Sequence, residues 1–315
     1  MEKRKVIGFG KSSYIVSLPK EWVKENKIKK GDELSIESNG SNLLLSAEFE
    51  GIESNNKEVV IDCMEKDLTL IKRLIHAAYI NNYRQIIVKD FSTNYSSQLR
   101  KAIKNLFAIE VIEEPNKITI LDILSVSDIS LPEIIRRMDN ITRDIFEESI
   151  KSFNQNTEHT INKTDNDVNR LAYLALKIVK TCTTDPGIMR TLKIDGSEIL
   201  HVWESVGRLE NIADATKRIA EANVTIKLSE KEKKVIVDFY ISLKNDFISV
   251  MNSYYLKDRT LVYRILSEHV TKVEDLGKLN LKKDISYSVI IEQLYLILES
   301  IRNIARSSLN TFLMK

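Results

Sequence analysis

The sequence has few cysteines, prolines and glycines. Its 315 residues include two cysteines, four prolines and nine glycines. Cys63 and Cys182 lie far apart without the spacing of a metal site, so reduced thiols in the cytoplasm are expected. No apolar run reaches the roughly 18 residues that span a bilayer, so membrane insertion is not expected. The first ten residues are basic but lack the apolar core of a signal peptide.

The sequence also has little excess of positive over negative charge. The formal net charge is +2, with 43% hydrophobic and 29% charged residues, which is typical of a globular protein. The chain as a whole is therefore not marked as a nucleic-acid binder, and any basic surface must be local. The length suits two or three domains.

The glycines and prolines divide the chain. Five of the nine glycines lie within the first 51 residues, and no proline follows Pro186. Proline removes a backbone donor and glycine costs backbone entropy, so a tract with few of both favours helices. The N-terminus is therefore expected to form strands and turns, and the C-terminal half to form helices.

The first fifty residues predict four short strands around one helix. Val6 and the stretch 14–18 are the first two strands, and Pro19 begins the helix. Asn39-Gly40 predicts a hairpin between 34–36 and 43–45. A unit this small exposes its strand edges, and a second copy would close them most simply.

This segment, from Arg4 to Ser46, resembles the AbrB/SpoVT family. The resemblance lies in Arg4-Lys5-Val6, in Ile15-Val16 with Leu18-Pro19-Lys20-Glu21, and in Ile28-Lys29-Lys30-Gly31-Asp32. It implies a dimeric swapped-hairpin β-barrel over residues 1–50 that binds DNA. The polar insert 11–14 is longer than the family's short loops. Other members of the fold are antitoxins, so the fold alone does not determine the target.

Four cations fall where the AbrB/SpoVT family places its DNA contacts: Arg4, Lys5, Lys11 and Lys24. Phosphate contacts from such side chains supply affinity that does not depend on base sequence. The alternative is a solvated charged surface, because Lys24 is interleaved with Glu21 and Glu25.

Residues 57–124 predict a separate α/β domain. Strands are expected at 58–63, 84–88, 110–113 and 118–121, with helices at 67–82 and from Ser96. The order β-α-β-α-β-β indicates a small two-layer sandwich. It contains no phosphate loop or catalytic cluster, and its expected role is a rigid spacer or a support for the dimer. His76 is expected to be a packed histidine.

Helical periodicity begins near residue 130. Six long helices are predicted, at 131–155, 160–184, 196–222, 229–256, 258–278 and 284–312. They divide into two three-helix bundles, about 127–224 and 227–315. Trp203 and Tyr240 are expected in their cores. The predicted fold class is thus multidomain α+β: a swapped-hairpin barrel, a small α/β sandwich and two three-helix bundles.

The helical region, 127–315, resembles the PhoU family of phosphate-uptake regulators. The matching motifs are Asp165–Leu171 (DNDVNRL), Arg208–Asp214 (RLENIAD) and, more weakly, Leu298–Ala305 (LESIRNIA). An AbrB-like head fused to PhoU-like bundles resembles the archaeal form of these regulators. The order of the parts is the strongest sign of this resemblance.

The PhoU resemblance also implies a metal site. The family's acidic-x-x-x-Asp pattern holds metal clusters, because carboxylates at i and i+4 share one helix face. Glu210 and Asp214 match the pattern fully, whereas Asp165 with Asn169 and Glu299 with Asn303 match it by half. The ion would be a divalent cation, iron or zinc. The alternatives are surface charge pairing and a bundle that has lost its metal cluster.

The sequence therefore predicts a cytoplasmic regulator that is not an enzyme. Its head would form a homodimer or larger assembly and bind DNA, while the bundles sense or relay phosphate status. Partners would be DNA and a phosphate transporter or signalling protein. In the alternative, the head only dimerises and the protein is an adaptor for a phosphate transporter. A metal-storage or metal-sensing bundle is a third interpretation.

Overall fold

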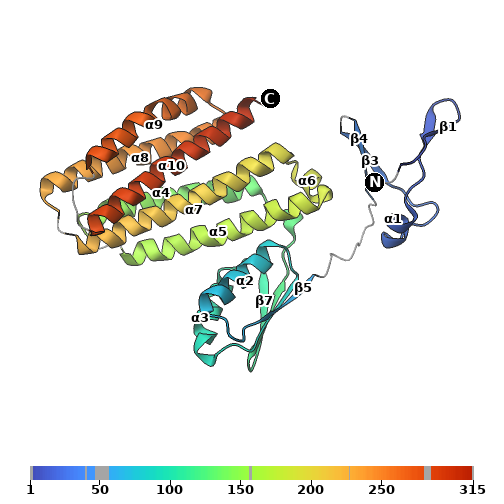
Figure 1. Ribbon diagram of the computed structural model, residues 1–315, viewed down its shortest axis with the longest axis horizontal. Helices are drawn as coiled ribbons and strands as arrows, with labels where there is room; N and C mark the ends of the chain where they lie inside the picture. The colour runs from blue at the N-terminus through green and yellow to red at the C-terminus, as the bar shows by residue number, and fades with distance from the viewer. Residues whose placement is uncertain are drawn as a thin grey trace. The chain divides into compact units, whose positions relative to one another are not determined.

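The protein is described from a computed structural model covering residues 3–39, 41–46, 57–155, 158–226, 228–279 and 285–313. It divides into two compact units, Met1–Asn55 and Asn56–Lys315, each of which is described by itself (Figure 1). Within the described residues no helix is both long and apolar enough to cross a membrane.

The first unit, the head, contains two separate antiparallel hairpins and one short helix. Strands β1 (Ile7–Phe9) and β2 (Ser13–Ile15) form one hairpin, and β3 (Ser35–Asn39) and β4 (Asn42–Ser46) form the other. Helix α1 (Lys20–Glu25) lies between them in sequence, directly after Pro19. The predicted order is thus observed, although β2 ends at Ile15 rather than at residue 18. Gly40 of the predicted turn lies outside the described residues.

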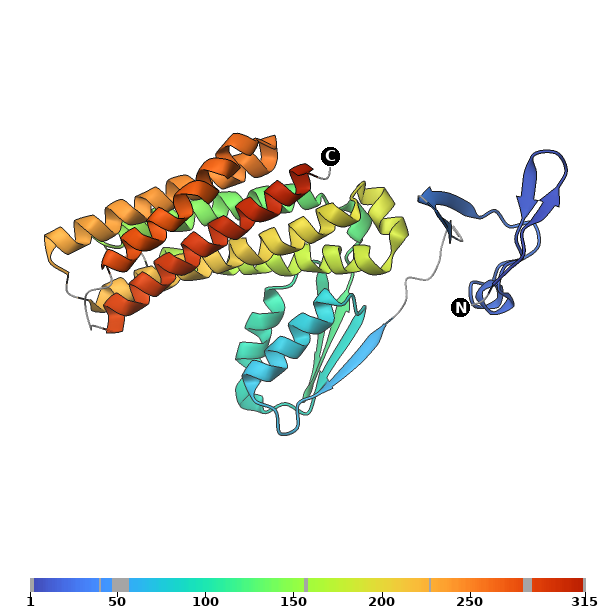
Figure 2. The ribbon, with the colours of Figure 1, turned by 45° about the horizontal axis from the view of Figure 1, so that its top comes forward.

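The second unit begins with a four-stranded sheet whose order is β5-β6-β8-β7. Its strands are β5 (Glu58–Asp62), β6 (Gln85–Lys89), β7 (Ile109–Glu114) and β8 (Lys117–Asp122). β5 and β6 are parallel and the other pairs are antiparallel. Helices α2 (Leu68–Ile80) and α3 (Ser96–Lys104) lie side by side on one face of the sheet (Figure 2). This is the predicted two-layer order.

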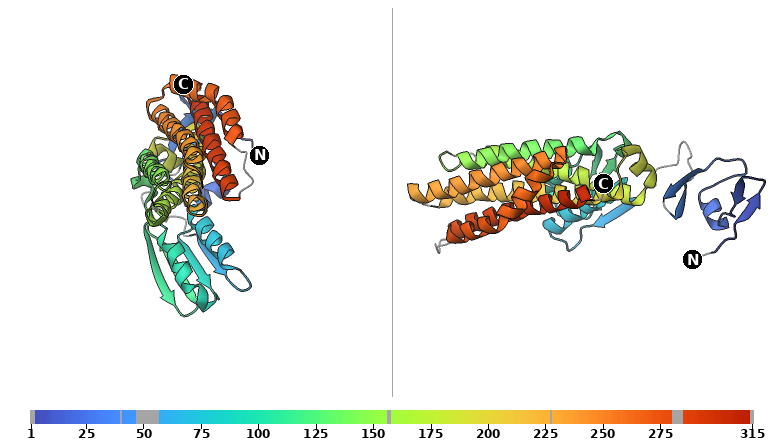
Figure 3. Two further views of the ribbon diagram at one scale, coloured as in Figure 1. Left: turned by 90° about the vertical axis from the view of Figure 1, so that its left-hand side faces the viewer. Right: turned by 90° about the horizontal axis from the view of Figure 1, so that it is seen from above.

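In the described part of the chain after this sheet, seven helices follow, and six of them are long. They are α4 (Leu131–Lys151), α5 (Glu158–Thr184), α6 (Pro186–Leu192), α7 (Gly196–Thr225), α8 (Glu230–Leu256), α9 (Arg259–Leu279) and α10 (Ile285–Leu313). The long helices pack lengthwise (Figure 3), with α7 beside α10 (Figure 1). One continuous apolar core runs through them. The multidomain α+β architecture with helical bundles is therefore confirmed.

Side-chain caps define several helix starts. Ser130 accepts from the backbone N–H of Glu133, and Ser229 forms a capping box with Glu232 at the start of α8. Between the predicted helices 160–184 and 196–222 the structure contains an additional short helix, α6, which Asp185 caps and whose first turn includes Pro186. Tyr240 is fully buried as expected, but the expectation for Trp203 was wrong, because it is 49% exposed.

Candidate functional site

The head exposes an unusual amount of apolar surface for its size. Helix α1 buries no residue, and each hairpin contains only two strands. Eight large apolar side chains of the head are exposed: Val6, Ile7, Phe9, Tyr14, Ile15, Val16, Ile36 and Leu43. An isolated two-stranded hairpin is marginal in water, and exposed apolar patches mark interaction surfaces. The head therefore has the surface of a unit that is completed by another chain.

A truncation tests this interpretation. A chain beginning at Lys57 should shift toward monomer, whereas the full chain should run as a dimer or a larger assembly. The reason is that removing the head removes the apolar surface that a second copy would bury. Light scattering measures the mass of both. An unchanged oligomeric state in the shorter chain would show that the head is not the main dimerising element.

The predicted DNA-binding cations are all on the surface of the head. Arg4 and Lys5 precede β1, Lys11 lies in the β1–β2 turn after Gly10, and Lys24 lies on α1, and all four are exposed. Gly10 has a φ of +68°, which favours glycine and sets the turn that presents Lys11. These exposed cations are accessible to a polyanion, as phosphate contacts require.

The PhoU-like motifs bring three carboxylates together between α5 and α7. Asp165 of α5 is buried, and one of its oxygens, Oδ1, has no hydrogen-bond partner among the described residues. Its other oxygen, Oδ2, accepts from Lys217 Nζ at 3.0 Å and from Asn169 Nδ2 at 3.5 Å. Glu210 and Asp214 of α7 lie near Asp165 and interact with it electrostatically.

The two α7 carboxylates are not ordinary surface charges. Burial, reinforced by Asp214 and Asp165, raises the pKa of Glu210 to about 7. Burial also raises the pKa of Asp214, and the Asp165 charge adds to this while Arg218 and Lys217 oppose it. By accessibility both side chains are half-buried, so the cluster is partly shielded from solvent.

The cluster does not fit a preformed metal centre. No group of three or more His, Cys, Asp or Glu side chains within the described ranges is arranged to hold a metal ion. The Lys217 ammonium pairs with Asp165 at 3.0 Å. The half-matching Glu299 is bound by His269 at 2.8 Å and by Arg302 at 3.0 Å. Metal binding by Glu210 and Asp214 stays a prediction.

Helix α5 also attaches the α/β domain to the bundles, and a buried lysine makes this contact. Lys177 is fully buried and donates to Asp122 Oδ2 at 2.5 Å and to the Tyr79 carbonyl at 3.2 Å. Its ammonium also lies 4.5 Å from the centre of the Tyr79 ring. Burial lowers the pKa of Lys177, and the hydrogen bond to Asp122 opposes that effect. Sequence reasoning missed this residue.

Two further contacts support the same interface. The His76 ring packs on Tyr173 with 4.3 Å between ring centres, which agrees with the expectation of a packed histidine. The Arg170 guanidinium lies over the Phe107 ring at 4.6 Å. Residues 169, 173 and 177 follow Asp165 at four-residue steps, so one face of α5 bears both the acidic cluster and the domain contact.

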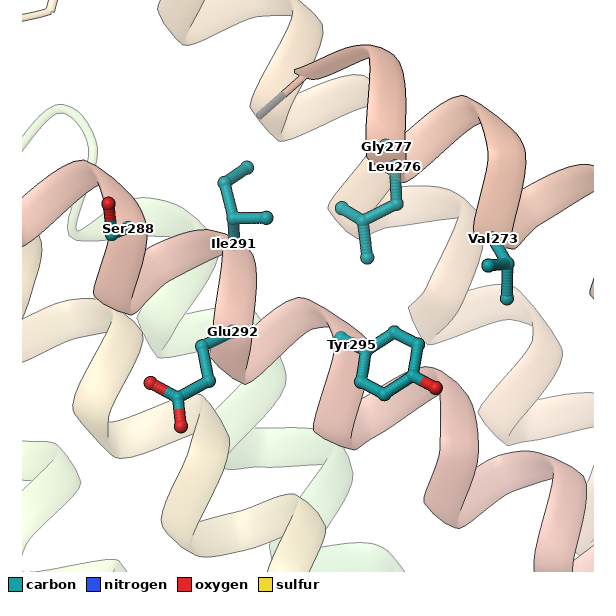
Figure 4. Close-up of a pocket in the computed structure, with 7 residues that line it drawn as sticks. All are labelled: Val273, Leu276, Gly277, Ser288, Ile291, Glu292 and Tyr295. Carbon is teal, nitrogen blue, oxygen red and sulfur yellow. The ribbon is translucent and has the colours of Figure 1, made fainter. Parts of the chain in front are cut away.

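A pocket of about 410 Å³ lies between α9 and α10 (Figure 4). Its lining residues are Val273, Leu276, Gly277, Ser288, Ile291, Glu292 and Tyr295. The lining is mostly apolar, and Glu292 is its single carboxylate. Ser288, Glu292 and Tyr295 supply its polar side-chain atoms.

Comparison with known proteins finds two family matches. Residues 9–48 match the family described as antidote-toxin recognition MazE, bacterial antitoxin, and residues 135–222 match the PhoU domain.

Among curated proteins, none matches this sequence. A solved structure, PhoU from Pseudomonas aeruginosa, matches at 11% identity with a TM-score of 0.44. That match covers 58% of this chain and 92% of the other, and similarity this low carries no functional information. The chain is thus similar to a MazE-type antitoxin domain over most of its head, and to the PhoU domain over most of α4, α5, α6 and most of α7.

Proposed function

We propose that this protein is a cytoplasmic, DNA-binding regulator of phosphate uptake. The observation that carries the proposal is the joining of a MazE-type domain and a PhoU domain in one chain. The head, of the AbrB/SpoVT type in this proposal, dimerises and binds DNA. The bundles sense or relay phosphate status.

The surface of the head supports the DNA-binding part of the proposal. Its exposed apolar strands supply the dimer contact, and Arg4, Lys5 and Lys11 lie exposed at and near β1. A dimer doubles this small set of cations, which gives two groups that can contact phosphates along one duplex. Lys24 lies on α1 rather than at β1, and in the same proposal it is a further phosphate contact.

The bundles act by binding rather than by chemistry in this proposal. The pocket between α9 and α10 has an apolar lining, and α5 ties the acidic cluster to the α/β domain. A change in charge or ligand at the acidic cluster can therefore act on the α/β domain through α5, as a relay requires. The partner on the bundle side is a phosphate transporter or a signalling protein.

Binding to the protein's own upstream DNA tests the proposal. The full chain should shift this DNA at low salt, and should bind it more tightly than a shuffled duplex at higher salt. The reason is that phosphate contacts weaken with salt while base contacts and DNA shape still discriminate between sequences. A gel shift at two salt concentrations is the measurement. Absence of binding at low salt would favour the transporter adaptor, in which the head only dimerises.

A further inference from the structure

The helical face of the α/β domain is basic without compensation. Helices α2 and α3 together contain no aspartate or glutamate. They contain five Lys and Arg residues: Lys72, Arg73, Arg100, Lys101 and Lys104. On a chain whose formal net charge is only +2, this is a marked local excess of positive charge.

These cations point away from the sheet. The inward faces of the two helices are apolar, with Ile71 and Ile75 on α2 and Leu99 and Ile103 on α3 all buried. Arg73, Lys101 and Lys104 are exposed, and Lys72 is half-buried. Figures 1 and 2 show the two helices together on one face of the sheet. We call Lys72, Arg73, Lys101 and Lys104 the α2–α3 basic surface.

Glu113 and Asp67, on the segments that flank α3 and α2, are both engaged in contacts of their own. Glu113 of β7 forms a two-point ion pair with Arg100, with N–O distances of 2.6 to 3.0 Å, so Arg100 is left out of the definition. Asp67 caps α2 by accepting from the backbone N–H of Leu70 at 2.9 Å. The four cations of the basic surface therefore have no carboxylate partner on their own helices.

We propose that the α2–α3 basic surface binds the phosphate backbone of the same DNA duplex that the head binds. This inference rests on the proposed DNA-binding function and assigns a second contact surface to it. The neutral residues among the cations, Thr69, Ser97 and Gln98, are exposed and can donate hydrogen bonds to phosphate oxygens. Neither helix exposes an aromatic ring, since Tyr79 is buried and α3 has none. The surface therefore lacks the anchors usual in protein–protein interfaces.

The connection of both domains in one chain also favours DNA as the partner of the basic surface. The head and the α/β domain are parts of one chain and follow each other in sequence. A duplex held by the head is therefore present at high effective concentration for the rest of the chain. Four additional cations per chain would then strengthen binding without recognising base sequence.

The experiment compares two charge-matched variants of the full chain. One replaces the basic surface (Lys72→Gln, Arg73→Gln, Lys101→Gln, Lys104→Gln). The control replaces one arginine and three lysines of α4 and α8, with matching exposure (Arg137→Gln, Lys231→Gln, Lys233→Gln, Lys234→Gln). Glutamine retains helix propensity, and circular dichroism checks the fold of both. Fluorescence anisotropy with a labelled duplex from the protein's own upstream DNA gives affinity at several salt concentrations.

The basic-surface variant should bind the duplex more weakly, with a flatter salt dependence, while the control matches the wild type. Removal of two protein–phosphate interactions would lower the slope of log affinity against log salt by about 1.8. It would also lower the affinity at 0.1 M salt roughly 60-fold if the two proteins bind equally at 1 M. Equal slopes and affinities for the two variants would overturn the inference.

Two further arms separate this inference from its alternatives. Replacing Arg4, Lys5 and Lys11 by glutamine tests the head alone. If only that change weakens binding, the proposed function stands and the basic-surface inference fails. If only the basic-surface change weakens binding, the proposed role of the head fails, and the claim of a duplex shared with the head is overturned, although the basic surface still binds DNA. Polyglutamate is the second probe: loss of its binding with unchanged duplex binding would assign the surface to an acidic protein and overturn the inference.

Discussion

Replacing Lys177 by methionine should lower the free energy of unfolding by about 3–5 kcal/mol. The ammonium of Lys177 is the close partner of Asp122, whose side chain is only 1% exposed. Without it, a buried carboxylate is left with the more distant cation of Arg84, at 3.8 Å. The unpaired charge, rather than the missing hydrogen bond, is the main cost. Urea denaturation followed by circular dichroism measures the change.

Two companion variants make the Lys177 result specific. Lys180→Met alters an exposed lysine on the same helix and should change stability by less than about 0.5 kcal/mol. Adding Asp122→Asn to Lys177→Met removes the stranded charge and should restore part of the lost stability. If Lys177→Met is no worse than Lys180→Met, the buried pair is not what holds the α/β domain on α5.

Replacing Glu210 by glutamine should stabilise the protein at pH 8 and have little effect at pH 4.5. The pKa of Glu210 is raised from 4.5 to about 7 in the folded protein, so the folded state binds the proton more tightly than the unfolded state. Stability from this group is thus present below pH 4.5 and is lost as the pH rises through 7. The full shift corresponds to about 3 kcal/mol at most, which glutamine avoids because it has no charge to bury.

The Glu210 measurement is a series of urea unfolding curves across this pH range, in the presence of a chelator. Glu204→Gln is the matched control, since Glu204 is on the same helix and pairs with Arg208 at the surface, at 4.0 Å. Its effect should be small at every pH. A Glu210→Gln effect that does not grow with pH would show that the carboxylate is not held in a buried acidic cluster.

Metal content tests the other interpretation of the same cluster. If Glu210 and Asp214 hold a cation, protein purified without chelator should contain near-stoichiometric metal, and Glu210→Ala with Asp214→Ala should remove it. Elemental analysis of both proteins measures this. Trace metal in both would leave the residues as a buried acidic cluster held by Lys217.

The sequence predicted the elements well because their signals are local. Ser130 and Ser229 are caps that can be read from a few neighbouring residues, and both begin helices as expected. Pro186 shows the limit of such reading. A proline after aspartate indicates either a break or a helix start, and here Asp185 caps a short helix.

The features that the sequence did not predict are contacts between helices. They depend on which face of each helix packs against a neighbouring element. Lys177 sits in a regular helical pattern, and nothing local shows that Asp122, 55 residues earlier, will neutralise it. Trp203 was expected in the core from its apolar character, but α7 turns it outward. The α5 motif supplied Asp165 and Asn169, but Lys217 as the partner of Asp165 appears only when α5 and α7 pack together.

The role of the head in DNA binding is tested by its salt dependence. Arg4→Gln, Lys5→Gln and Lys11→Gln are combined in the full chain, and Arg137→Gln, Lys231→Gln and Lys234→Gln serve as the charge-matched control. Affinity for the protein's own upstream DNA is measured across salt concentrations. We expect the slope of log affinity against log salt to fall by about 0.9 for each phosphate that is no longer neutralised, summed over both chains of the dimer, with the control unchanged. Binding by the head variant with the wild-type slope would contradict a DNA-binding head and favour the transporter adaptor.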